Sequence, residues 1–219
     1  RVAPADGALV HSISMPRTVA SCLEKLAVDS ADCRFGMHSI GDAGMPQLCS
    51  ALASAPVVRL DLSCNSLNAA SAAPLAALLD GHATLEALDV SANALADGVT
   101  ALANVLARPG STLRALDVHA NSVRDDGAVA LAGMLRSNVT LTALDLRNNY
   151  LTDVSARALS ASLAQTKTLR LCHLQGNDIT PAMWDALEQL VADPANSLES
   201  IEGADNATAE LMGTVCLLQ

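Results

Sequence analysis

Leu113-R-A-L-D-V-H-A-N-S-Val123 is the stretch that decides the fold, because four other blocks of the chain match it. The others begin at Val57, Leu85, Leu141 and Leu169, so each block starts 28 residues after the one before it. All five follow the pattern L-x-x-L-x-L-x-x-N-x-L with conservative replacements. A fixed period in this range is typical of a solenoid, in which each coil packs mainly on its neighbours.

Each block predicts a short strand followed by a helix. The L-x-L alternation predicts the strand, and apolar residues at helical spacing after the Asn predict the helix. An irregular coil precedes the five blocks at 33–40, where His38 replaces the Asn, and its helix is expected over 45–52. Before it, the stripe that starts at Val19 predicts an amphipathic helix with a capping box of Ser21 and Glu24.

These blocks resemble the leucine-rich repeat family, and the 28-residue period is most similar to its ribonuclease-inhibitor-type subclass. The resemblance covers about residues 30–205. It implies an α/β solenoid shaped like a horseshoe, with a parallel β-sheet on the concave face and helices on the convex face. We expect an N-terminal arm and capping helix over 1–29, the repeats over 30–196 and a C-terminal capping segment over 197–219.

One Asn recurs where each predicted strand ends. A side-chain amide both donates and accepts hydrogen bonds, so it can satisfy the backbone groups that a turn leaves unpaired. We therefore interpret this Asn ladder as structural. Its members are Asn65, Asn93, Asn121, Asn149 and Asn177.

The strand positions that point away from the leucines define the predicted concave face. We expect this face to bind a partner, and an acidic row of four equivalent aspartates to run along it, about 5 Å apart. The row could receive Lys or Arg side chains of a partner, or it could be ordinary repeat consensus that neighbouring arginines neutralise. The candidate residues are Arg59, Asp61, Glu86, Asp89, Arg114, Asp117, His119, Asp145, Arg147, Arg170 and His173.

Composition excludes several classes of function. A net charge of −10 argues against binding of nucleic acid, which depends on Lys and Arg at phosphates. Aromatic residues make up 1% of the chain, which argues against base stacking or an aromatic ligand pocket. No apolar run is long enough to span a membrane, so no membrane insertion is expected. His119 and His173 fall two coils apart, roughly 10 Å, which is too far to share a zinc ion. No metal or other cofactor is expected.

The chain carries no recognisable nucleophile-elbow, phosphate-loop, zinc-protease or dinucleotide motif, so we expect no enzyme activity. The six cysteines form no C-x-x-C pair, which favours reduced thiols and a cytoplasmic, cytoskeletal or ciliary setting. The expected function is that of a protein-interaction module or scaffold subunit of a larger protein complex. It would bind a protein partner, and a basic segment would suit the acidic row. The alternatives are a regulator resembling Ran GTPase-activating proteins, or the sensor or inhibitor repeats of a larger protein.

Overall fold

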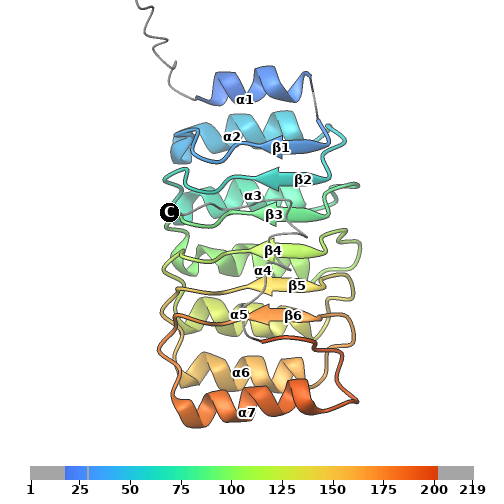
Figure 1. The fold of residues 1–219 in the computed structure, drawn as a ribbon. Helices are drawn as coiled ribbons and strands as arrows, with labels where there is room; N and C mark the ends of the chain where they lie inside the picture. The colour runs from blue at the N-terminus through green and yellow to red at the C-terminus, as the bar shows by residue number, and fades with distance from the viewer. Residues whose placement is uncertain (1–17, 29, 202–219) are drawn as a thin grey trace, which may run out of the picture.

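The computed structural model describes residues 18–28 and 30–201. In these residues, six strands form one parallel sheet, in which each strand pairs with the next along the chain. The helices lie together behind the sheet, so the coils form a single stack (Figure 1). The strands are β1 Asp32–Arg34, β2 Arg59–Asp61, β3 Ala87–Asp89, β4 Ala115–Asp117, β5 Ala143–Asp145 and β6 Leu171–His173. The α-helices are α1 Val19–Leu26, α2 Gly41–Leu52, α3 Ala72–Leu79, α4 Val99–Leu106, α5 Asp125–Leu135, α6 Asp153–Leu163 and α7 Pro181–Ala192, and two 3₁₀ turns, η1 Ala69–Ser71 and η2 Ala96–Gly98, precede α3 and α4. The predicted α/β solenoid is confirmed.

Leucines in register hold the stack together. Leu88 pairs with Leu116, and Leu116 pairs with Leu144, in the parallel ladders of β3, β4 and β5. All three side chains are fully buried in one continuous core between the sheet and the helices. A second, smaller apolar cluster is formed by the first residue of each of the strands β3 to β6, which precedes the core residue of that strand. Its members are Ala87, Ala115, Ala143 and Leu171.

The first coil differs in detail from the prediction. Helix α2 begins at Gly41 and not at Met45, and it contains Pro46 in its interior, where the ring removes one i→i−4 hydrogen bond. The capping box of α1 is formed by Thr18 and Ser21 in place of Ser21 and Glu24. The helix therefore starts at Val19, where its apolar stripe begins, and one turn before the start that the predicted capping box implied. Residues 1–17 of the predicted N-terminal arm and residues 202–219 of the predicted C-terminal capping segment lie outside the described residues.

The Asn ladder joins each coil to the next by hydrogen bonds. The Oδ1 atom of Asn149 accepts from the backbone N–H groups of Asn121 and Val123, one coil earlier, at 3.0 and 2.9 Å. Its Nδ2 atom donates to the carbonyl oxygens of Val118 and Leu146. Corresponding bonds recur along the ladder, and in the first coil Asn65 accepts from the N–H of His38. One amide thus satisfies the turns of two coils.

The residue before each ladder Asn adopts a left-handed backbone conformation. Ala92 and Ala120 have φ angles of 51° and 50°, and Gly176 has a φ of 70° at the equivalent place. A non-glycine residue pays roughly 1–2 kcal/mol for this conformation. The Asn hydrogen bonds offset that cost, because they fix the turn that requires it.

Aspartates at the helix starts also link successive coils. Asp125, in the first turn of α5, accepts hydrogen bonds from the backbone N–H and the hydroxyl of Thr152 at 2.9 and 2.7 Å. Asp153 does the same for Thr180, one coil later. Both carboxylates lie in the first turn of a helix, where the helix dipole favours a negative charge, and each one also fastens the start of the next helix. None of the helices in the described ranges is long and apolar enough to cross a membrane.

Replacing Leu116 with Ala should lower the free energy of unfolding by about 2–5 kcal/mol, because the side chain is fully buried between two leucines. Val154, which is 59% exposed on α6, provides the matched control, and Val154→Ala should change stability by less than about 0.5 kcal/mol. Urea unfolding followed by circular dichroism measures both. Equal effects of the two substitutions would contradict the observed core.

Replacing Asn149 with Ala should cost about 2–4 kcal/mol, because two backbone N–H groups of the preceding coil lose their acceptor. Hydrogen exchange should accelerate at the amides of Asn121 and Val123 before it does so elsewhere. A loss of stability without local exchange at these two amides would contradict the bridging role of the ladder.

Candidate functional site

The predicted acidic row exists, and it lies on the face of the sheet away from the helices, here called the open face. The parallel register aligns Asp61 with Asp89, then Asp117 and Asp145. His173 continues the row in β6. Because successive side chains of a strand point to opposite faces of the sheet, these side chains lie on the other face from the core leucines.

The row differs from the expected open track because most of it is buried. Asp89, Asp117 and Asp145 have relative exposures of 5%, 6% and 0%, and His173 is also fully buried. The expectation that a partner's Lys or Arg meets freely accessible carboxylates is therefore wrong for these residues. Each aspartate instead accepts a hydrogen bond from the backbone N–H two residues later. The donors are Ser63, Ser91, His119 and Arg147.

Asp145 is the most strongly paired carboxylate of the row. The Nε atom of Arg147 donates to both of its oxygens, at 3.0 and 2.8 Å, and the Nδ1 atom of His173 lies 3.6 Å from Oδ2. Burial alone would raise the pKa of Asp145, but the hydrogen bonds from His173 and Arg147 hold that pKa below its ordinary value. Of the arginines predicted to neutralise the row, Arg147 does so.

Asp117 and His119 form a second pair. The Nδ1 atom of His119 lies 2.8 Å from Oδ1 of Asp117. Burial raises the pKa of Asp117 above its ordinary value. Burial would lower the pKa of His119, yet the hydrogen bond with Asp117 raises it above its ordinary value. The hydrogen bond thus favours the protonated form of His119, whereas burial disfavours the charged form of Asp117.

Asp89 is buried beside Asp117 without a cationic partner of its own among its described contacts. Burial, and then the charge of Asp117, raise the pKa of Asp89 to about 7. The middle of the row consequently holds a carboxyl group that is uncharged over part of the neutral range.

Three potential metal ligands meet in this row, which the sequence reasoning missed because it considered only the pair of histidines. Ligand atoms of Asp117, His119 and Asp145 lie within 4.8 Å of one another. Arg147 already neutralises Asp145 through both oxygens, so the cluster is balanced by the protein's own charges. We assign no metal to it.

A second row lies at the edge of the sheet, one residue before each of the strands β3 to β6 and before the bridge residue Ser200, and is here called the rim row. Backbone hydrogen bonds connect its members in sequence, from Glu86 to Arg114, Thr142, Arg170 and Glu199. The prediction placed Glu86, Arg114 and Arg170 on the concave face, but they belong to this edge and are exposed. Arg114 lies 3.7 Å from Glu86, and Arg170 lies 2.5 Å from Glu199. Arg59, in contrast, is in β2 and is exposed next to this edge.

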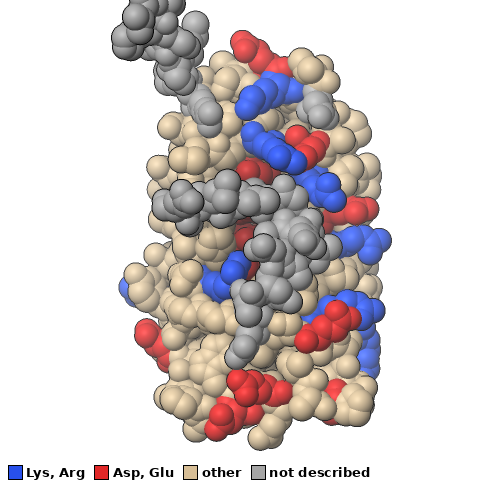
Figure 2. Space-filling view, in the orientation of Figure 1, with Lys and Arg blue, Asp and Glu red and all other residues tan. Residues whose placement is uncertain are grey.

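Charged side chains gather along one side of the open face. Figure 2 shows Lys and Arg side chains interspersed with Asp and Glu side chains along the right-hand margin of the view. This margin corresponds to the ends at which the strands begin (Figure 1). The charged rim is therefore more accessible than the buried acidic row.

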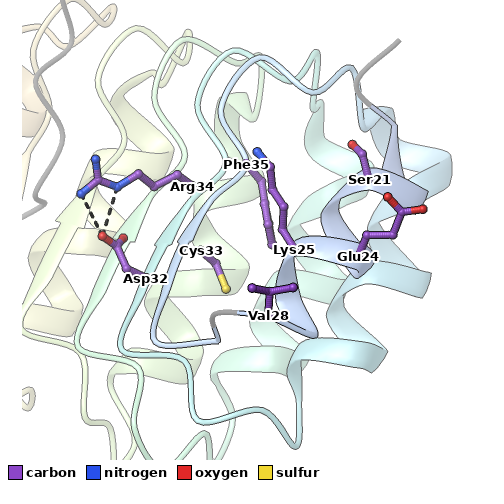
Figure 3. A pocket seen from close by; sticks show the side chains of 8 residues that line it. All are labelled: Ser21, Glu24, Lys25, Val28, Asp32, Cys33, Arg34 and Phe35. Carbon is purple, nitrogen blue, oxygen red and sulfur yellow. Dashed lines mark hydrogen bonds and ion pairs between the residues drawn. The ribbon is translucent and has the colours of Figure 1, made fainter. Parts of the chain in front are cut away.

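A hollow lies at the end of the stack, between α1 and β1 (Figure 3). Its lining includes the buried Phe35 and Cys33 and the exposed ion pair of Arg34 with Asp32 at 2.8 Å. The thiol of Cys33 donates to the carbonyl oxygen of Ser30 at 3.5 Å.

The buried aspartates predict opposite effects of two amide substitutions. Because the folded-state pKa of Asp89 is raised, the folded protein binds the proton more tightly, and stability falls as pH rises from about 4 to about 7. Asp89→Asn should remove this penalty and stabilise the protein at pH 8 by up to about 4 kcal/mol.

Asp145→Asn provides the matched comparison. The lowered pKa of Asp145 means that its ionised form stabilises the fold, and this contribution is lost as pH falls through the folded-state pKa. Removing the charge should leave Arg147 without a counterion and cost about 3–5 kcal/mol at pH 8. Urea unfolding of both variants at pH 4 and pH 8 tests the pair, and a stabilised Asp145→Asn protein would contradict the assignment.

Comparison with known proteins supports the repeat architecture. The family model described as "Leucine Rich repeat" matches residues 111–132 and 137–160. No curated protein matches the chain. Among solved structures, the chain is similar to "Leiomodin-1 Actin-Binding Site 2 (ABS2)", with 18% sequence identity, a TM-score of 0.43 and coverage of 52% of this chain and 70% of that chain. A likeness at this level carries no functional argument, and the ribonuclease-inhibitor-type subclass stays a prediction. The two matched segments are successive coils of a stack whose register runs unbroken from β1 to β6, and the chain therefore carries leucine-rich repeats.

Proposed function

We propose that this chain is a non-catalytic protein-interaction module, which binds another protein across the open face and its charged rim. The observation that carries the proposal is the one-sided covering of the sheet. All described helices lie on one side, and no described helix covers the other (Figure 1). Parallel sheets are usually covered on both faces, so a face that no described helix covers is a natural place for a partner.

The chemistry of this face suits a protein surface better than a small molecule. The first residue of strands β3, β4 and β5 is an alanine, so the open face has low relief. A helix or loop of a partner could therefore approach the backbone closely. Exposed charges at the rim would set the orientation of a partner, and buried pairs such as Asp145 with Arg147 would keep the surface rigid. We extend the proposal to membership of a multi-protein complex, because a repeat surface of this kind works by contact alone.

Site-specific photocrosslinking tests which face is used. A photoreactive amino acid would replace Arg59 at the open face or, as the matched control, Val129 on α5, which is 42% exposed on the helix side. Crosslinking in a lysate of the source cells, followed by mass spectrometry, should give a discrete protein adduct from position 59 and none from position 129. A discrete adduct from position 129 alone would move the interface to the helices and overturn the proposal.

A further inference from the structure

A groove runs beside the rim row, apart from the buried acidic row. This groove crosses four coils at the edge where the strands begin, and its lining contains Glu86, Arg114, Lys167 and Arg170. Those four side chains carry a net charge of +2, that is three cations and one anion. The whole chain has a formal charge of −10, so the groove is a local exception to the charge of the protein.

Arg114 and Arg170 flank the smaller Thr142 in the rim row. They are two coils apart, which corresponds to about 10 Å between their backbones. Their acidic partners, Glu86 and Glu199, lie on the outer sides of the row and not between them. A carboxylate placed above Thr142 could therefore be approached by both guanidinium groups, which bind carboxylates with paired N–H donors.

The existing ion pairs of these arginines leave both guanidinium groups accessible to a ligand. The side chains of Arg114 and Glu86 are 60% and 51% exposed, and those of Arg170 and Glu199 are both 58% exposed. Ion pairs with this much exposure contribute about 0–1 kcal/mol, so a partner's carboxylate can share or replace them at little cost.

Threonine hydroxyls along the groove add a second kind of recognition. Thr84 and Thr112 donate their hydroxyl protons to the backbone carbonyls of Val57 and Leu85, at 2.8 and 2.7 Å. Thr142 likewise donates to the carbonyl of Arg114 at 3.0 Å. With its proton directed inward, each hydroxyl oxygen keeps a lone pair that can accept a hydrogen bond. The backbone N–H groups of an extended peptide are matching donors.

We propose that this groove binds an extended acidic segment of a partner protein, with one Asp or Glu carboxylate held between Arg114 and Arg170 above Thr142. A peptide fits better than a nucleic acid, because the threonine oxygens call for N–H donors, and the groove holds few cations for a dense row of phosphates. This inference rests on the proposed function and specifies the partner that the rim would recognise.

A purified-protein binding assay tests the inference. The probe is a short fluorescein-labelled peptide of alternating Glu and Ser, compared with its Gln/Ser analogue by fluorescence anisotropy at low salt. The Glu peptide should bind, and the Arg114→Glu/Arg170→Glu variant should weaken its affinity at least about tenfold. The matched control is Arg34→Glu/Arg108→Glu. It makes the same change of charge at two other exposed arginines, which are likewise in ion pairs, with Asp32 and Asp80, and it should stay within about twofold of the wild type.

A substitution within the site gives an independent readout. Thr142→Glu should place a carboxylate between the two arginines and so compete with the peptide, whereas Thr142→Gln, of nearly the same size, should retain most binding. Circular dichroism and urea unfolding confirm that each variant is folded.

Three results would overturn the acidic-peptide site: equal binding of the Glu and Gln peptides, equal loss in both double variants, or tighter binding of a single-stranded DNA oligonucleotide of the same charge. None of these results affects the crosslinking test of the open face. If a partner crosslinks at position 59 but the groove does not bind the Glu peptide, the proposed function is supported and the acidic-peptide site is excluded.

Discussion

Each coil of this protein can hide its leucines only against the next coil, and the rest of the structure depends on that constraint. A single strand and helix have too little surface to form a core, so burial comes from exact repetition of the same path. The row of Leu88, Leu116 and Leu144 shows the result, since all three are fully buried in register. Hydrogen bonds then fix the spacing that the apolar contacts require. The Asn ladder ties the turns, and Asp125 and Asp153 tie the helix starts.

Repetition also creates an electrostatic problem. A period that aligns leucines must align the residue beside them, so Asp61, Asp89, Asp117 and Asp145 fall in one row. Like charges at strand spacing repel, and burial makes the repulsion stronger. The side chain that donates a hydrogen bond to the aspartate differs along the row. It is a serine hydroxyl at Asp61, a histidine at Asp117 and an arginine at Asp145. The variable residue two positions after each Asp therefore tunes a charge that the repeat itself imposes.

The division between buried and exposed charge bears on function. The buried row stiffens the middle of the open face, while the charges able to meet a partner directly are at the rim. There, the residue before each strand is free of the core, so its identity can change without loss of the fold. Arg114, Thr142 and Arg170 occupy such positions. One face of the sheet thus combines a buried acidic row, which the fold constrains, with a rim row whose residues can vary.

The sequence by itself determined the fold, because a 28-residue period with leucines at fixed places admits one way of burying them. Strand order, the buried leucine row and the alignment of the aspartates all followed from that period. The helix start at Gly41 was missed, because two glycines there suggested a break. Only the tertiary structure decided which charges are buried and which are paired. Those properties depend on distances between side chains of different coils, such as Arg147 with Asp145 and its neighbour His173, or the gap between Arg114 and Arg170. A one-dimensional pattern places residues in columns, but it does not say how far each side chain reaches across the next coil.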